Sequence, residues 1–218
     1  MELQIGPQEI FRLAGVPITD TMITGFVISV ILIISAFLIS RHLKEKPGRV
    51  QAAAEMFVEG FISLIDGIMP GEGRKYFPMI GTILLYIGAS NLVGVVPYVN
   101  NPTADINTTV AYALVVFLVS HYAGIKTKGL GSYIKGYFEP IPFIAPLNII
   151  GEFAKPVSHA FRLFGNMVGG GIILAIAMDK APWLFPVPLM AWFDLFAGVI
   201  QAFIFTMLAI VYTSVQRA

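Results

Sequence analysis

The sequence predicts an all-α integral membrane protein with about five transmembrane helices and one amphipathic helix at the membrane surface. The first observation is composition: 56% of the 218 residues are hydrophobic and only 12% are charged, against about 25% charged residues in an average soluble domain. The second is that several uncharged segments can cross a hydrocarbon core of about 30 Å at about 1.5 Å per residue. We therefore expect residues 1–218 to form a single membrane domain.

The N-terminal residues 1–21 contain Glu2, Glu9, Arg12 and Asp20 between short apolar runs. They lack the basic start and apolar centre of a cleavable signal peptide, so we expect an external N-terminal segment. Residues 22–40 are uncharged and form the first predicted span, which ends at a basic flank.

The next segments differ in polarity. In residues 50–69, Glu55 and Glu59 interrupt apolar residues spaced by three and four, which is typical of an amphipathic surface helix. Residues 77–99 and 108–125 are uncharged and form the second and third predicted spans.

Glycines, prolines and lysines are mixed through residues 126–146, which indicates an irregular basic connection. The last two predicted spans are 147–178 and 189–214, and both contain polar side chains. An unbroken helix over 147–178 would be about 48 Å long, so we expect a long tilted hairpin. Alternatively, Pro156 breaks the helix and only its later part spans.

The distribution of Lys and Arg predicts the orientation. With five spans, ten of these residues fall on one side, against Arg12 and Lys180 on the other. The positive-inside rule then places the N-terminus outside and the C-terminus in the cytoplasm, and we expect a bacterial inner (plasma) membrane. The ten residues are Arg41, Lys44, Lys46, Arg49, Arg74, Lys75, Lys126, Lys128, Lys135 and Arg217.

Arg162 is the most unusual residue, because it lies near the middle of the fourth predicted span. An arginine there costs roughly 2.5–3.5 kcal/mol on insertion scales and cannot lose its proton. Ser158, Gly165, Asn166 and Gly169 share its helical face, and small residues allow another helix to approach closely. If Pro156 breaks the helix, Arg162 instead extends to the interface, and composition leaves both interpretations open.

Other polar residues accompany it. Asp194 and Gln201 lie seven residues apart, two turns along one face of an α-helix, where they could line a water-filled path. The alternative is that Asp194 is an interfacial cap that points to water. Glu152 and Lys155 are spaced as a local ion pair.

The remaining polar groups exclude several classes of function. His121 and His159 could relay protons, but a lone histidine is more often a simple hydrogen-bonding partner. The three histidines have no metal-ligand spacing and there is no phosphate-binding GxxxxGK[ST] loop. We therefore expect no cofactor and no metal site. A net charge of +1 gives no reason to expect a nucleic-acid partner.

Three stretches carry a specific pattern. Residues 155–158 are Lys-Pro-Val-Ser and residues 161–167 are Phe-Arg-Leu-Phe-Gly-Asn-Met. Residues 201–208 are Gln-Ala-Phe-Ile-Phe-Thr-Met-Leu, and residues 102–109 are Pro-Thr-Ala-Asp-Ile-Asn-Thr-Thr. In order and spacing, these stretches closely resemble the ATP synthase a subunit family of the F-type membrane Fo sector.

The resemblance implies a non-catalytic subunit that offers two half-channels to a rotating ring of proteolipid c subunits carrying H⁺ or Na⁺, beside b-type peripheral stalk subunits and the lipid bilayer. Arg162 matches the family's essential arginine. Asn166 and Gln201 match positions that place the arginine and line the access path. Asp194 matches an outer half-channel position, and Glu152 corresponds roughly to the cytoplasmic exit.

The resemblance also implies the mechanism: a fixed positive charge lowers the proton affinity of each passing ring carboxylate and blocks direct leakage between the half-channels. One position departs from the pattern. Gly171 stands nine residues after the arginine, where many members have an acidic residue or histidine, so the outer path has one ionisable group fewer than expected.

Two other classes of function require features that the sequence lacks. A self-contained membrane transporter or channel often shows corresponding broken helices in two halves of its chain, and none is evident here. An intramembrane enzyme needs a nucleophile or metal constellation, and the sequence offers neither.

Overall fold

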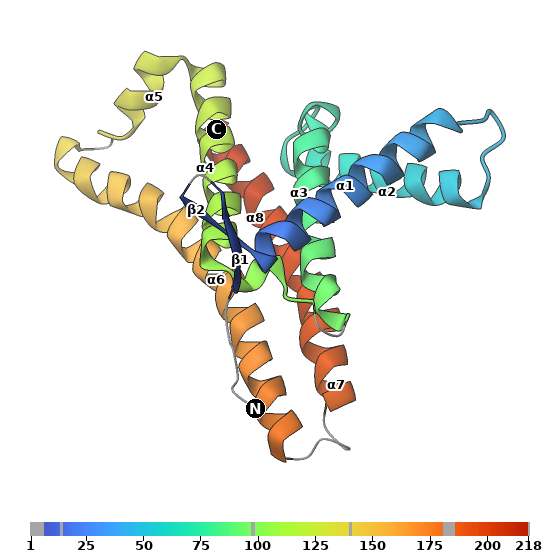
Figure 1. Cartoon of the computed structure of the whole chain (residues 1–218). Helices are drawn as coiled ribbons and strands as arrows, with labels where there is room; N and C mark the ends of the chain where they lie inside the picture. The colour runs from blue at the N-terminus through green and yellow to red at the C-terminus, as the bar shows by residue number, and fades with distance from the viewer. Residues whose placement is uncertain (1–6, 14, 97–98, 140, 181–185, 218) are drawn as a thin grey trace.

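The computed structural model describes residues 7–13, 15–96, 99–139, 141–180 and 186–217. Residues 1–6 of the predicted external segment, and residues 97 and 98 near the end of the second predicted span, lie outside the described residues. The fold is almost entirely helical, and five helical segments are long and apolar enough to cross a membrane (Figure 1). The predicted fold class is therefore confirmed.

The five spanning segments lie close to the predicted ranges. They are α1 (Asp20–Arg41), α3 (Gly73–Leu92) continued by the 3₁₀ turn η1 (Val93–Val95), α4 (Ile106–Lys128), α6 (Ala145–Lys180), and a last segment built from α7 (Pro186–Met190), the π-helix η4 (Ala191–Ala197) and α8 (Gly198–Arg217).

Large apolar side chains cover the outside of these helices. Phe26 and Ile33 on α1 are 71% and 68% exposed, and Phe161 on α6 is 60% exposed. An apolar outer surface is stable in lipid, whereas water would make it costly. The exposed residues of α1 therefore fit a helix that faces the bilayer.

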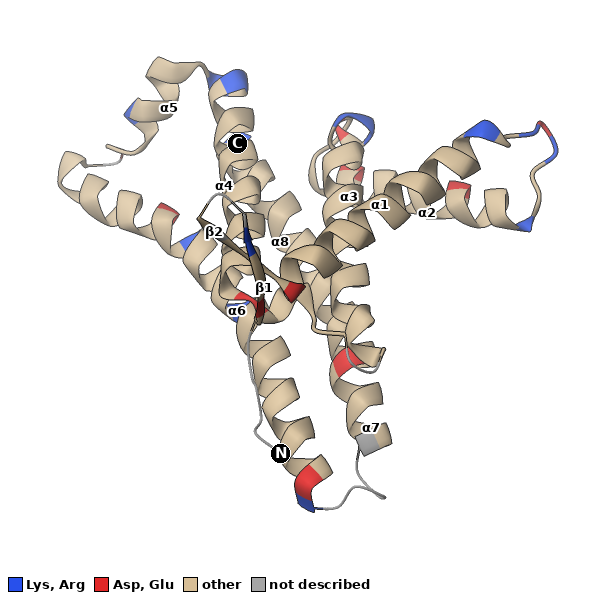
Figure 2. Cartoon of the chain, viewed as in Figure 1, with Lys and Arg blue, Asp and Glu red and all other residues tan. Residues whose placement is uncertain are grey.

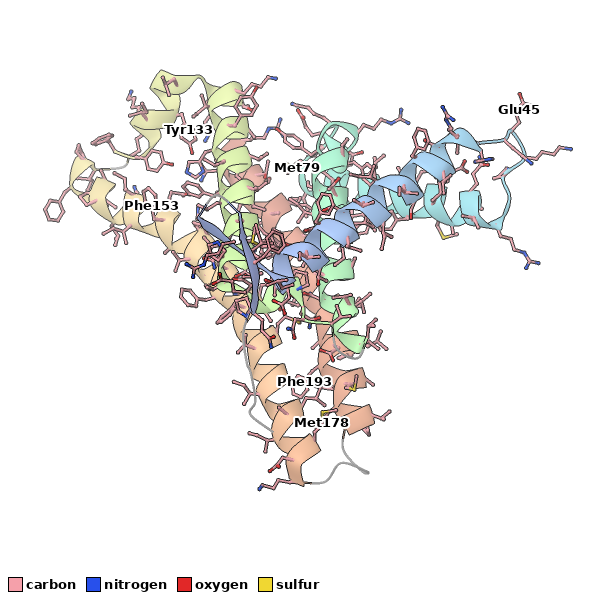
Figure 3. All side chains as sticks on the ribbon, viewed as in Figure 1. Glu45, Met79, Tyr133, Phe153, Met178 and Phe193 are labelled. Carbon is pink, nitrogen blue, oxygen red and sulfur yellow. The ribbon has the colours of Figure 1, made fainter. Side chains whose placement is uncertain are left out.

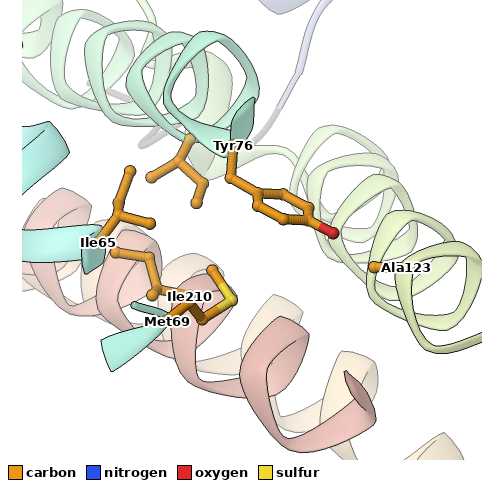
Figure 4. Packing of buried hydrophobic residues seen from close by; sticks show 6 residues of the cluster. Ile65, Met69, Tyr76, Ala123 and Ile210 are labelled. Atoms are coloured by element: carbon orange, nitrogen blue, oxygen red, sulfur yellow. The ribbon is translucent and has the colours of Figure 1, made fainter. Parts of the chain in front are cut away.

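The amphipathic helix α2 (Arg49–Ile68) packs mainly on α3, with some contact to α8. Its buried end contributes to a cluster that also includes side chains from α3, α4 and α8 (Figure 4). The buried members are Ile65, Met69, Tyr76, Ile80, Ala123 and Ile210.

A second cluster joins α3, α4, α6 and α8. It contains Ile87, Val116, Leu163, Ala202, Phe205 and Ala209. Alanines at these helix contacts let the backbones approach closely, because lipid supplies no hydrophobic drive for helices to associate. Close packing in this cluster determines which faces of α6 and α8 remain outside.

The buried amide of Asn91 connects three elements. Its Nδ2 donates to the backbone oxygen of Gly198 at the start of α8 (2.8 Å), and its Oδ1 accepts from Thr103 Oγ1 (2.7 Å) in the 3₁₀ turn η2 (Pro102–Ala104). A polar group inside an apolar bundle must be hydrogen-bonded. Asn91 therefore fixes the height of α8 against α3.

Two regions outside the predicted helices contain regular structure. In the predicted external segment, β1 (Glu9–Leu13) and β2 (Val16–Thr19) pair antiparallel, and Gly15 before β2 has a positive φ of 85°. The predicted connection 126–146 contains the end of α4, the helix α5 (Leu130–Gly136) and the 3₁₀ turn η3 (Pro142–Ile144). Gly129, with φ 80°, allows the turn between α4 and α5.

The spanning segments alternate in direction, so the end of α1, the start of α2, the end of α4 and α5 lie toward the same end of the molecule, in the upper part of Figure 1, with α5 on the left and the turn from α1 to α2 on the right. Blue Lys and Arg segments are concentrated at that end, and the spanning helices are mostly uncharged (Figure 2). At the opposite end, α6 and the segment formed by α7 and η4 run side by side as an antiparallel hairpin.

Candidate functional site

Arg162 lies near the middle of α6, which continues without interruption from Ala145 to Lys180 and contains Pro156. The alternative in which Pro156 ends the helix is therefore wrong. Pro156 is buried, and packing around it holds the helix together although one backbone hydrogen bond is lost. The side chain of Arg162 is exposed and makes no hydrogen bond or ion pair with any described residue.

The surface around Arg162 is made of small residues. A Cβ atom added at Gly165 or Gly169 would meet nothing within 4 Å. A strip without side chains next to an unpaired guanidinium is a surface that another helix can approach closely. The predicted face of α6 is therefore open to a partner along its middle.

Asn166 and Gln201, which were both expected to belong to the site around Arg162, are in contact. Asn166 Nδ2 on α6 donates to Gln201 Oε1 on α8 over 2.7 Å. Gln201 is only 3% exposed, and its Nε2 has no hydrogen-bond partner among the described residues. The amide of Gln201 is thus held in place by Asn166 while its donor end is left free.

Asp194 lies within the π-helix η4 and is half-buried, with no hydrogen bond or ion pair to a described residue. A π-helix has wider turns than an α-helix, and such segments are frequent at functional sites. The seven residues between Asp194 and Gln201 therefore include part of a π-helix and do not amount to two regular α-helical turns.

Phe193 also belongs to η4, and its aromatic ring lies between the two arms of the hairpin (Figure 3). A Cβ atom added at Gly170 would come within 2.9 Å of its Cδ1 atom. Gly170 is therefore a contact glycine. The neighbouring Gly171 is different, because it is exposed and a Cβ there would meet nothing within 4 Å.

Glu152 forms the predicted ion pair, with Lys155 Nζ 2.5 Å from its Oε1 atom. Two further groups face the other carboxylate oxygen of Glu152, Oε2, and neither was predicted to contact this residue. Gln216 Nε2 from α8 donates to Oε2 over 2.6 Å, and His121 Nε2 from α4 lies 3.9 Å from it. Glu152 is thus held between three helices.

An open cavity of about 440 Å³ reaches Glu152 from the end of the molecule that carries α5. Tyr133 on α5 borders it and donates to Gln216 Oε1 over 2.7 Å, with its hydroxyl 3.0 Å from that of Tyr137. Burial raises the pKa of Tyr133 above its ordinary value, so the phenol stays a neutral donor. No sequence signal pointed to Tyr133, because residues 126–146 were expected to be irregular.

The two histidines differ. His121 Nδ1 bonds the backbone oxygen of Phe117 over 2.9 Å, the simple partner role expected for it. His159 is 2% exposed and stacks on Phe205 with ring centroids 4.3 Å apart, but makes no hydrogen bond to a described residue. Among the described residues, no group of three or more His, Asp and Glu could hold a metal ion.

The comparisons with known proteins agree with the motifs. The family model described as ATP synthase A chain matches residues 22–214. ATP synthase subunit a of Moorella thermoacetica is 39% identical over 208 residues, which cover 95% of this chain and 95% of that protein. ATP synthase subunit a, sodium ion specific, of Propionigenium modestum is 39% identical, covering 91% of this chain and 74% of that protein.

A third relative is ATP synthase subunit a 3 of Pelobacter propionicus, which is 42% identical over 87% of this chain and 83% of its own length. The family match includes the segments that carry Arg162, Asp194 and Gln201. The chain therefore belongs to the ATP synthase A chain family, and it is a multi-pass membrane protein that acts as an ion-translocating subunit of ATP synthase without being catalytic by itself.

Proposed function

We propose that the chain forms two half-channels against a rotating ring of c subunits, and that Arg162 couples ion flow to rotation of this ring and to ATP synthesis. The observation that carries the proposal is the unpaired, exposed guanidinium of Arg162 on a face of α6 lined by Gly165 and Gly169. A charge at membrane depth needs a partner. A carboxylate on another chain is the simplest group that would supply one.

The charge of Arg162 then has two effects. It lowers the proton affinity of each ring carboxylate that passes, because an opposite charge favours the ionised form. It also repels cations, so ions cannot pass directly between the half-channels and must travel with the ring. The membrane potential drives this movement with about 2.3 kcal/mol per charge per 100 mV.

We assign the remaining residues to the two half-channels. Glu152, at the inner end of the open cavity of about 440 Å³, belongs to the cytoplasmic half-channel. Asp194 belongs to the outer one, where Gly171 supplies no second ionisable group. To Asn166, four residues after Arg162, and to Gln201, which accepts its hydrogen bond, we assign the role of placing the arginine.

The proposal includes the surroundings of the chain. Its partners are the ring of proteolipid c subunits, b-type peripheral stalk subunits and the lipid bilayer, and its ion is H⁺ or Na⁺. The name of the Propionigenium modestum relative specifies sodium, so the family accommodates that ion. The excess of basic residues at one end supports an inner (plasma) membrane location with the N-terminus outside and the C-terminus in the cytoplasm.

Substitution of the arginine in the assembled enzyme tests the proposal. We expect Arg162→Ala to abolish ATP-driven ion pumping in membrane vesicles while the complex still assembles. Arg41→Ala is the matched control, since Arg41 lies at the end of α1 and packs on Phe37 there, 4.6 Å from its ring centroid. Normal pumping by Arg162→Ala would refute the role.

Co-purification separates this function from that of a self-contained transporter or channel. A mild-detergent preparation should contain the chain together with a small proteolipid in many copies. A preparation that pumps ions without this proteolipid would support the transporter instead.

A further inference from the structure

A small cavity lies between α4, α6 and α8, next to the open cavity at Glu152. Its volume is about 10 Å³, which is roughly the room that one water molecule needs. The two cavities share Glu152, Lys155 and Gln216 as lining residues. The small cavity therefore continues the open one into the helix bundle. Its ionisable lining consists of His121, Glu152, Lys155, His159 and Tyr212.

His159 is the lining residue nearest in sequence to Arg162. It is 2% exposed, and its Nε2 atom is buried without a hydrogen-bond partner among the described residues. Buried polar atoms nearly always have a partner, from the protein or from ordered water. This nitrogen is therefore a free acceptor or donor beside a cavity of the size of a water molecule.

Pro156 provides a second free polar atom at the same place. It also lines the cavity, and because proline has no N–H, the backbone oxygen of Glu152, four residues earlier, loses its helical donor. Glu152, Pro156 and His159 lie on one face of α6 at spacings of four and three. This face carries groups that a single water molecule could bond.

We propose that the small cavity binds one water molecule between Glu152 and Nε2 of His159, and that His159 relays protons between Glu152 and the part of α6 that carries Arg162. The inference rests on the proposed function, because it names a further residue and the ion of the proposed cytoplasmic half-channel. Neither the resemblance nor the relatives assign His159 a role.

The relay conserves protons and charge. A proton that enters through the open cavity sits on the carboxylate of Glu152 and passes to the water, which gives one of its own protons to Nε2. One O–H bond at Glu152 is broken, one N–H bond at His159 is formed, and the water is unchanged. The imidazolium then releases its Nδ1 proton to water on the side of Arg162, through which a proton reaches the ring carboxylate. Water-assisted transfer of the remaining proton from Nε2 to Nδ1 restores the first tautomer.

The charges around His159 favour rapid passage rather than storage. Arg162 is one turn away and Lys155 lines the same cavity, so two positive charges oppose a lasting imidazolium, while Glu152 attracts the proton back. The path therefore carries H⁺ and not Na⁺, since hard metal cations take several oxygen ligands and one water with an imidazole offers too few.

Substitution of His159 in the assembled enzyme tests the relay. We expect His159→Gln, which can still bond a water but cannot carry a proton, to slow proton flux through the membrane sector by roughly tenfold or more. ATP hydrolysis by the detached catalytic sector and the amount of assembled complex should not change. An unchanged flux in His159→Gln would overturn the relay.

Filling the cavity tests the water without changing any titratable group. Ala113 on α4 lines the cavity and is 2% exposed, and Ala113→Val should displace the water and slow the flux several-fold. Ala123→Val is the matched control, because Ala123 is a buried alanine of the same helix that packs in the Ile65 cluster. Equal flux in the two variants would overturn the water site.

The ion is tested separately. We expect ATP hydrolysis and pumping by the complex to be independent of Na⁺, and pumping that requires Na⁺ and produces no pH change would overturn the inference. Failure here is distinguishable from failure of the proposed function. If Arg162→Ala still abolishes pumping while His159→Gln and Ala113→Val do not affect it, only the relay is wrong.

Discussion

The side-chain amide of Asn166 on α6 donates a 2.7 Å hydrogen bond to Oε1 of Gln201 on α8, which joins residues 35 positions apart in the chain. Asn166 lies one helical turn after Arg162 on the exposed side of α6, whereas Gln201 is buried. The bond therefore connects the exposed charged face to the interior of the bundle.

The two partners of this bond should not be equivalent. Asn166→Leu leaves both ends of the buried Gln201 amide without a partner, which should cost about 1–3 kcal/mol of stability. Gln201→Leu removes the buried amide and leaves only an exposed one, so its cost should be smaller. Thermal stability of the purified complex measures both. The double variant should resemble Gln201→Leu alone, and equal costs for the two single variants would contradict this account.

Asp194 should contribute to translocation through its charge. It is half-buried in η4 and unpaired among the described residues, so we expect Asp194→Asn to slow ATP-driven pumping in vesicles. Asp179→Asn is the control, because Asp179 is exposed near the end of α6 and pairs with Lys180 over 3.0 Å. If Asp194→Asn pumps at the wild-type rate at every pH, Asp194 does not act in translocation and is an interfacial cap instead.

Gly170 and Gly171 are neighbours with opposite surroundings. Gly170→Ala places a Cβ 2.9 Å from Phe193 Cδ1 and 3.0 Å from its Cβ, and crowding of this kind should destabilise the hairpin by about 1–3 kcal/mol. Gly171→Ala meets open space and should be neutral or up to about 1 kcal/mol stabilising, since alanine favours a helix. Thermal unfolding of the two variants gives the comparison, and a larger loss in Gly171→Ala would refute it.

Glu72 should make the complex sensitive to acid. Lys75 donates to it over 2.7 Å and Arg217 at the end of α8 over 2.6 Å, and these contacts, first that of Lys75, hold the pKa of Glu72 below its ordinary value. A lowered pKa in the folded state means that the stabilisation is present above the unfolded pKa of about 4.3 and is lost as pH falls through the lower folded value.

The corresponding measurement is thermal stability against pH. We expect Glu72→Gln to lower stability near pH 7 and to reduce the further loss on acidification. Glu59→Gln provides the control, because Glu59 is exposed on α2 and makes no hydrogen bond or ion pair to a described residue. If Glu72→Gln loses as much stability on acidification as wild type, the contacts of Glu72 do not contribute.

The sequence did not predict helix α5 or the hairpin of β1 and β2, because local residue preferences in these segments do not indicate regular structure. Residues 126–146 contain many glycines and prolines, which favour an irregular chain, yet α5 forms there because Tyr133 anchors it to Gln216 on α8. The hairpin of β1 and β2 was likewise not predicted. Its strands of 5 and 4 residues are too short for a periodic pattern to be distinguished from a loop.

The sequence predicted which residues belong to the candidate site, but not which of them contact one another. Arg162 and Glu152 stand out in a sequence because charge is rare at membrane depth. By contrast, Gln216 and Tyr133 are ordinary polar residues outside the predicted spans, and only tertiary packing brings Gln216 to Glu152 and Tyr133 to Gln216. The π-helix at Asp194 was not visible either, since a local widening of the helix leaves the residue pattern unchanged.

The sequence alone determined the membrane class, the five spans and the residues whose charge or polarity requires explanation. These follow from the length of apolar segments and from the cost of each polar group in lipid, which are properties of single segments. The tertiary structure decided that Arg162 faces outward without a partner, that Asn166 bonds Gln201 and that Glu152 bonds Gln216. These relationships depend on the rotation and depth of each helix, which are set by packing between distant segments; Glu152 and Gln216, for example, lie 64 positions apart in the chain.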